Sequence, residues 1–162
     1  MAQRIDPNEL MYTKFEPVVL NHFIVYMEGI PSFMIKKIKS PSIEFGEVKL
    51  DHINVYQKFK GKGNWQDITM TLYQPIIPSG AQKVMEWIRT AHESSTGRDG
   101  YADFYKREIT INSLGPIGDK VGEWIIHGAW VKTFDNIEFD WANDQHAELN
   151  LTVAYDYAES KY

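Results

Sequence analysis

The sequence predicts a mainly β protein, a sandwich or barrel of about seven to eight antiparallel strands with one flanking α-helix at about residues 80–92. Residues 146–157 alternate apolar and polar side chains, which is the pattern of a strand with one buried and one solvated face. The aromatic content is 14%, and aromatic side chains are enriched in strands. One segment stands out with the apolar spacing of an amphipathic helix.

Composition limits the classes of protein to consider. With 162 residues we expect a single domain over residues 1–162, large enough to fold around its own core. The chain has no cysteine, which excludes disulfides, a thiol nucleophile and thiolate zinc sites. Its first ten residues lack the apolar core of a signal peptide, and no apolar run approaches the ~18 residues of a membrane span. The net charge of −5 disfavours nucleic acid as a tightly held ligand.

The first half of the chain predicts an arm followed by strands. Residues 1–20 show little pattern and indicate an N-terminal arm. Residues 22–27 are apolar at both even and odd positions, as in a strand buried on both faces. A second strand is expected at 33–38. An extended, interrupted stretch follows, in which we expect a long loop or hairpin at about 48–64. Residues 68–73 then alternate as a half-buried strand.

The helix begins after Ser79, which can cap its first turn. Its apolar positions fall at helical spacing and predict one buried face: Ala81, Val84, Met85, Ile88 and Ala91. Residues 92–100 have the composition of an exposed loop, and a strand is expected around Ile109 and Ile111.

The last third predicts further strands. Trp124, Ile126 and Trp130 share one parity, and a short alternation follows at residues 137–141. The final strand ends in the sequence Tyr155–Asp156–Tyr157. From these patterns we expect a core that includes Trp87, Trp124, Trp130, Leu149, Leu151, Val153 and Tyr155.

No catalytic or metal-binding constellation emerges from the sequence. The five histidines share no metal-binding spacing. Glu138 and Asp140 fall on one strand face, where a solvated surface explains them better than acid–base catalysis. Residues 140–144 lack the glycine and the terminal glutamate of a calcium loop, and indicate a turn between strands. We therefore expect no enzymatic activity and no cofactor or metal.

Residues 56–65 interleave lysines with aromatic side chains, as proteins that bind single-stranded nucleic acid do. A solvated hairpin tip explains the same residues more simply. A third interpretation is an arm that reaches an acidic neighbouring subunit.

Three C-terminal segments together resemble the tail tube proteins of contractile-tailed bacteriophages: Gly128–Trp130, Ile137–Trp141 and Leu149–Tyr157. Trp65 before a strand and Trp87 within a helix are similar to that family as well, and the resemblance extends over nearly the whole chain. It implies a compact β-barrel-like sandwich, hexameric rings that stack into a tube, and passage of DNA without specific binding. The implied partners are the sheath protein, the tube initiator or baseplate, the tape measure and the tail terminator. The implied location is the virion tail, assembled in the host cytoplasm.

The resemblance also suggests roles for individual residues. In the family, a long loop or hairpin contacts the adjacent ring, which implies inter-ring contacts by Tyr56, Lys58, Phe59, Lys60 and Lys62. A lumen that does not grip DNA should be acidic or neutral. The candidates for lumen or rim carboxylates are Glu108, Glu138, Asp140, Glu148 and Asp156. The N-terminal arm, at Ile5–Phe15, and the C-terminal residues Glu159–Tyr162 are secondary contact candidates.

Three alternatives stay open at the level of sequence. A related tube initiator would look the same. The inner tube of a phage-derived contractile injection or type VI secretion system would share these features. A protein of another class, a small β-barrel that binds an apolar ligand between its aromatic faces, would share the strand pattern alone.

Overall fold

The computed structural model describes residues 16–161, and in this part of the chain nine strands confirm the mainly β prediction. The strands are β1 (Phe23–Met27), β2 (Ile35–Ile38), β3 (Ser42–His52), β4 (Val55–Gln66), β5 (Ile68–Tyr73), β6 (Arg107–Leu114), β7 (Lys120–Asp135), β8 (Glu148–Ala154) and β9 (Tyr157–Ser160). The helices are α2 (Gly80–Ala91), the short α3 (Ala102–Tyr105) and the 3-10 turn η1 (Ser32–Met34). The N-terminal arm at Ile5–Phe15 and the last residue, Tyr162, lie outside the described residues.

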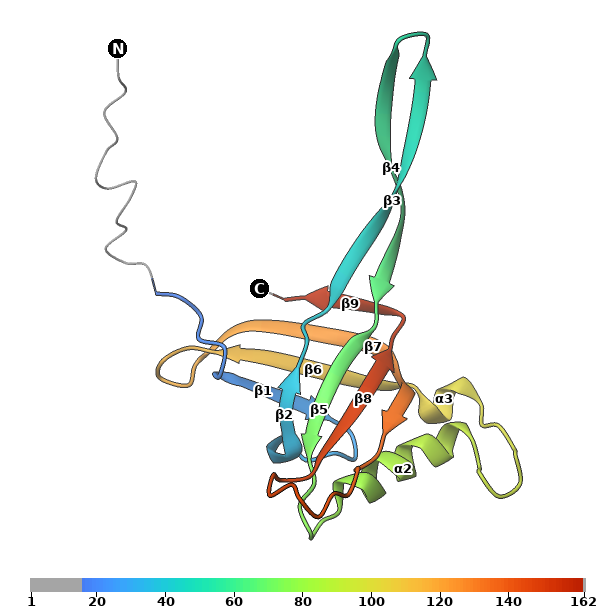
Figure 1. Cartoon of the computed structure of the whole chain (residues 1–162). Helices are drawn as coiled ribbons and strands as arrows, with labels where there is room; N and C mark the ends of the chain where they lie inside the picture. Colours follow the sequence, from blue (N-terminus) through green and yellow to red (C-terminus); the bar gives the residue numbers. More distant parts are fainter. Residues whose placement is uncertain (1–15, 162) are drawn as a thin grey trace.

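Two sheet layers pack against each other, and the long strand β7 belongs to both (Figure 1). One layer contains β1, β6, β7 and β9, and the other contains β2, β5, β8 and β7, with antiparallel pairing throughout. The sheet ends at β1 on one side and at β2 on the other, and these two strands are not paired with each other. The body is therefore an open sandwich and not a closed barrel.

The core lies between the two layers and follows the strand alternation. Ile68, Met70 and Leu72 of β5 face inward beside Leu149, Leu151 and Val153 of β8, and all six are buried. Ile109, Ile111 and Ile126 fill the opposite layer. Burying each such side chain stabilises the fold by roughly 1.5–3 kcal/mol. Apolar side chains thus occupy the space in which a barrel protein would hold a ligand.

Helix α2 covers one end of the sandwich and confirms the predicted flanking helix. The Ser79 hydroxyl accepts a hydrogen bond from the backbone N–H of Gln82, so it caps the first turn as expected. Val84 and Trp87 are buried. The indole N–H of Trp87 donates to the carbonyl of Tyr105 over 2.7 Å, which ties α3 to α2.

Strand β9 and the adjacent end of β8 pair with β7 in the same register, with an interruption at Tyr155 and Asp156. The interruption lies opposite Gly128, which has a φ of +67°. Before the interruption the buried residues have odd numbers, as Val153 does. Beyond it the buried residue has an even number, because Ala158 is buried while Tyr157 is exposed. The predicted strand over residues 146–157 is therefore two strands, separated where the chain passes from one layer to the other.

Strand β7 also changes parity at this level, at a bulge that contains Gly128, because Arg107 of β6 pairs with Ala129 whereas Ile109 pairs with Ile126. Ile126 and Ala129 are the buried residues of this strand. Trp130, expected in the core beside Trp124, instead packs its ring edge-on against Tyr105 at a centroid distance of 6.5 Å. Trp124 and Tyr155 are half-buried and pack against the core.

The strand predicted at residues 137–141 is wrong. This stretch belongs to an irregular loop between β7 and β8, and Phe139 and Trp141 are exposed. Only Ile137 packs against the core among its three alternating apolar residues. The strand predicted at residues 33–38 is shorter than expected, since residues 32–34 form η1.

Candidate functional site

A two-stranded hairpin made of β3 and β4 projects from the body (Figure 1). It pairs from Ser42 opposite Gln66 to His52 opposite Val55, so it contains and extends the segment 48–64 expected as a loop or hairpin. At its base, the ring of Trp65 lies 6.0 Å from that of Tyr155. An isolated two-stranded hairpin is marginally stable in water, so its outer part is a candidate for contact with another chain.

Two glycines form a narrow waist in the hairpin, where the register shifts between Phe45 and Glu47. A β-carbon on Gly61 would lie 2.9 Å from the carbonyl carbon of Gly46. This close approach requires glycine, and the two ribbons cross in this part of the hairpin in Figure 1.

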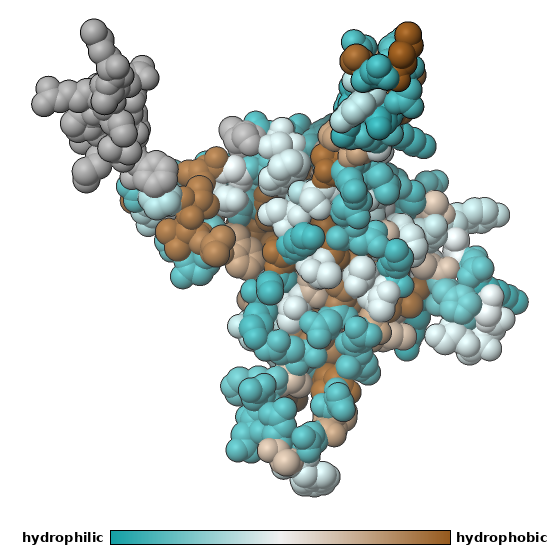
Figure 2. Space-filling view, turned by 45° about the horizontal axis from the view of Figure 1, so that its top comes forward, coloured by the Kyte–Doolittle hydropathy of each residue, from teal (hydrophilic) through white to brown (hydrophobic). Residues whose placement is uncertain are grey.

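Beyond the waist, the hairpin has two chemically different faces. Residues opposite each other share a face, so the pairs Val48–Phe59, Leu50–Gln57 and His52–Val55 define one side. We call Val48, Leu50, Val55 and Phe59 the apolar hairpin face; each is about half exposed or more. Together with Ile53 at the turn, these residues leave the outer hairpin apolar and uncovered, as the brown atoms at its tip in Figure 2 show.

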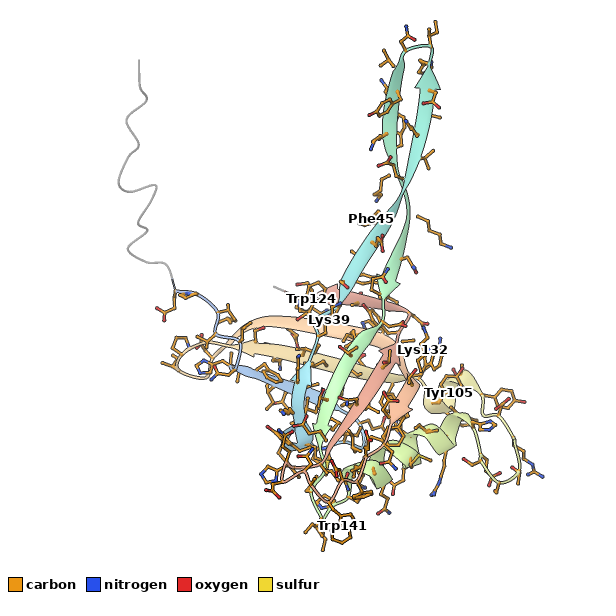
Figure 3. All side chains as sticks on the ribbon, viewed as in Figure 1. Lys39, Phe45, Tyr105, Trp124, Lys132 and Trp141 are labelled. Carbon is orange, nitrogen blue, oxygen red and sulfur yellow. The ribbon has the colours of Figure 1, made fainter. Side chains whose placement is uncertain are left out.

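The other side of the hairpin is charged, and its charges are partly satisfied within the hairpin. Lys58 forms an ion pair with Glu47 over 3.1 Å. The ammonium group of Lys60 lies 4.6 Å from the ring centroid of Phe45, and that of Lys49 lies 4.0 Å from the ring of Tyr56. Figure 3 labels Phe45 on this hairpin.

The structure thus divides the residues expected at an inter-ring contact. Tyr56, Lys58 and Lys60 lie on the charged side, whereas Phe59 lies on the apolar hairpin face. Lys62 is exposed and lies at the waist.

The five acidic residues expected at a lumen or rim do not share one surface. Glu148, at the start of β8, forms an ion pair with Lys36, and its hydrogen bond raises the pKa of that lysine. Asp156 binds Lys106 through both carboxylate oxygens at 2.9 Å. Two of the five are therefore neutralised by lysines from other elements.

The remaining three have no lysine partner among the described residues. Glu108 lies on the exposed side of β6, 3.3 Å from Nδ1 of His127. Glu138 and Asp140 belong to the β7–β8 loop. They lie at the end of the body opposite the hairpin, close to the labelled Trp141 (Figure 3).

The unpaired edges of β1 and β2 frame a groove of about 470 Å³. Its lining includes the apolar residues Val18, Val19 and Phe23 on one side and Ile38 on the other. Unpaired strand edges of this kind are templates for pairing with another chain. Val18, Val19 and Leu20 are exposed. Figure 2 shows apolar surface, in brown, next to the grey residues.

Sequence reasoning missed one further surface, at the same end as the β7–β8 loop. We call the large exposed apolar residues Ile76, Ile77, Phe139 and Trp141 the loop-end patch. The available signals were two isoleucines between Pro75 and Pro78, and an alternation at 137–141 that we interpreted as a strand. Apolar residues within turn sequences are the signal that could have identified it.

The described residues offer little to catalysis. No three histidine, aspartate or glutamate side chains in this part of the chain are arranged to hold a metal ion. Among the helices of residues 16–161, none has the length and apolarity that crossing a membrane requires.

Comparison with known families decides what this architecture is. The family model of the T4-like virus tail tube protein gp19 matches residues 19–159. The chain belongs to this family. The tail tube proteins are structural tube subunits and not enzymes, which agrees with the expectation from sequence. A comparison with curated proteins finds no match.

Solved structures of low sequence identity share the fold of this tail tube protein. The sheath/tube terminator of an extracellular contractile injection system, PVC, has a TM-score of 0.74 at 16% identity and covers 92% of this chain and 99% of its own. The tube terminating cap of the anti-feeding prophage has a TM-score of 0.73 at 17% identity, covering 91% and 92%. Hcp1 from Flavobacterium johnsoniae is more distant, with a TM-score of 0.50 at 9% identity, covering 86% and 94%.

Proposed function

We propose that this tail tube protein forms hexameric rings that stack into the inner tube of a phage tail, through which DNA passes inside a contractile sheath. The observation that carries the proposal is the projecting hairpin with its uncovered apolar hairpin face. A monomer gains nothing from a long two-stranded ribbon that exposes Val48, Leu50, Val55 and Phe59 to water, whereas burying them in a neighbour stabilises both partners.

Lateral joining of subunits is supported by the open sandwich. The strand edges of β1 and β2 are unpaired, and apolar residues lie along the groove between them. In a closed ring, each subunit would cover these edges on its neighbour, and the hazard of unpaired edges would disappear.

The charge distribution fits a conduit that does not hold its cargo. The net charge of −5 is repeated in every subunit around a ring and repels phosphates. We assign Glu108 to a lumen-facing surface, and Glu138 and Asp140 to the rim of the ring, because these three carboxylates have no lysine partner in the described structure.

Within the hairpin, we assign the buried part of the inter-ring contact to the apolar hairpin face. Lys58, Lys60 and Lys62 would lie at the margin of that contact together with Tyr56. Ion pairs at such an exposed margin contribute only about 0–1 kcal/mol each, so the lysines would orient the contact more than they hold it.

Negative-stain electron microscopy of the concentrated protein tests this proposal. The wild-type chain should form hollow rings and tubes, and the double variant Val48→Ser/Phe59→Ser should form rings that do not stack. Tyr101→Ser/Phe104→Ser, which removes two exposed aromatic side chains away from the hairpin, is the matched control and should still form tubes. A wild-type chain that stays monomeric even when seeded with tube fragments would contradict the proposed function.

A further inference from the structure

The loop-end patch lies at the opposite end of the body from the hairpin. Figure 3 shows Trp141 at the lower end of the molecule and Phe45 on the hairpin that rises from the upper end. The β5–α2 turn and the β7–β8 loop meet there, because Gln74 donates its backbone N–H to the carbonyl of Ala147 over 3.2 Å. The exposed isoleucines of the turn and the exposed aromatics of the loop therefore leave the body at the same end.

The β7–β8 loop is held in shape by its own contacts. Ile137 packs against the core and anchors its first part. The carboxylate of Asp140 accepts the backbone N–H of Ala142 at 3.0 Å, and the side-chain oxygen of Asn143 accepts that of Gln145 at 3.0 Å. Such turns fix the backbone locally. They hold Phe139, 88% exposed, and Trp141, fully exposed, outside the body.

The charge of the loop complements that of the hairpin. Residues 136–147 contain Glu138, Asp140 and Asp144 and no lysine or arginine. The hairpin, residues 42–66, carries four lysines (Lys49, Lys58, Lys60 and Lys62) against three carboxylates. One end of the molecule thus combines apolar side chains with positive charge, and the other combines apolar side chains with negative charge.

We propose that the loop-end patch is the acceptor for the apolar hairpin face of a second copy in the next ring, with Glu138, Asp140 and Asp144 facing the hairpin lysines. This inference rests on the proposed function and names the partner surface that the hairpin needs. The two surfaces are different and lie at opposite ends of one chain, so the contact is heterologous and repeats along an axis without closing. The hairpin offers a long surface for such a contact, since the 12 residues of β4 span about 40 Å.

A complementation experiment tests the pairing of these two surfaces. The hairpin variant Val48→Ser/Phe59→Ser keeps its loop-end patch, and the loop variant Phe139→Ser/Trp141→Ser keeps its hairpin. Each variant alone should sediment as single rings. Mixed in equal amounts, they should form a species of twice that mass that grows no further, because each ring then offers one intact surface. The control variant Tyr101→Ser/Phe104→Ser removes two exposed aromatics elsewhere and should stack as the wild type does.

Three outcomes would overturn the inference. The first is that the loop variant forms tubes of normal length. The second is that it forms such tubes but no longer recruits a sheath, which would assign the patch to the sheath. The third is that the two variants fail to complement each other. Each result leaves the tube function itself standing. Failure of the wild-type chain to stack would instead contradict the proposed function.

Chemical crosslinking gives an independent readout. The chain has no cysteine, so Phe59→Cys and Phe139→Cys provide single thiols in two separate preparations. A bismaleimide should link them into dimers when the two preparations are assembled together. When Tyr101→Cys takes the place of Phe139→Cys in the mixture, no crosslinked dimer should form. An equal yield of dimer from the two mixtures would contradict the assignment of the loop-end patch as the acceptor.

Discussion

Gly128 and Asp156 face each other across β7 and the β8–β9 junction so closely that a β-carbon on Gly128 would lie 2.1 Å from Oδ2 of Asp156. The backbone N–H of Asp156 donates to the carbonyl of His127 over 3.0 Å, and its carboxylate binds Lys106. These contacts fix the point at which both strands change parity. The Asp156 carboxylate is thus a structural group at the joint between the two layers.

We expect Gly128→Ala to lower the free energy of unfolding by about 2–4 kcal/mol, because overpacking of about 1–3 kcal/mol adds to a left-handed backbone cost of about 1 kcal/mol. Gly118→Ala is the matched control. Gly118 has a φ of +82° with no atom within 4 Å of the added carbon, so only the backbone cost applies. Urea unfolding measures both. Equal losses for the two variants would show that Asp156 does not restrict position 128.

Lys106→Met should remove a contribution to the free energy of unfolding that the wild type itself loses at alkaline pH. The hydrogen bond to Asp156 raises the pKa of Lys106 above its ordinary value of 10.5. The folded state then holds the proton more tightly than the unfolded state. The pair's contribution is therefore fully present below pH 10.5 and is lost as pH rises through the folded pKa.

The effect should be small, below about 1 kcal/mol, because Lys106 and Asp156 are partly exposed. Urea unfolding of wild type and variant from about pH 8 to about pH 11 should show a gap that narrows at the alkaline end. Lys62→Met controls for the loss of one positive charge. A gap that is constant with pH would contradict the pairing.

Trp87→Phe should lower the free energy of unfolding by about 1–3 kcal/mol, because it leaves the part-buried carbonyl of Tyr105 without its donor. Trp141→Phe is the internal comparison: this side chain is fully exposed, so stability should stay within about 0.5 kcal/mol of wild type. Thermal unfolding followed by circular dichroism measures both changes. A large loss from Trp141→Phe would mean that the side chain supports the fold and is not held available for a partner.

Reversing the hairpin charge with Lys58→Glu/Lys60→Glu/Lys62→Glu should prevent stacking at low ionic strength while leaving the body folded. The variant hairpin carries one lysine and six carboxylates, and it meets an acidic loop. Added salt screens exposed charges at contact distances, so stacking should partly recover at about 1 M salt. Light scattering across a salt series measures the recovery. Tubes that form equally well at every salt concentration would exclude a role for these lysines.

Local patterns in the sequence are enough to predict the strands at 68–73 and 148–154 and helix α2. Each has a periodic apolar face whose burial does not depend on a distant bend, and Ser79 marks where the helix begins. The bulge at Gly128 is different, because Asp156, which packs closely against Gly128, lies 28 residues further along the chain. Trp130 was therefore assigned to the wrong side of its strand.

The assembly surfaces were harder to predict for the same reason. Lys36 and Lys106 neutralise Glu148 and Asp156 from other elements, and the sequence gives no local sign of either pairing. The alternation at residues 137–141 has the period of a strand, but its cause is different: Ile137 anchors the loop, while Phe139 and Trp141 project from it. The spacing of two residues was therefore real, but it did not arise from a strand at residues 137–141.

The hairpin and the loop-end patch also give the subunit a direction, because its two ends are different. Any stack of such subunits, whatever its length, ends in a crown of hairpins on one side and in a ring of acidic, aromatic loops on the other. Nothing in the repeating contact measures distance, so the length of the tube must be set from outside it. A protein that starts the tube and a protein that stops it consequently meet different chemistry, and neither could take the place of the other.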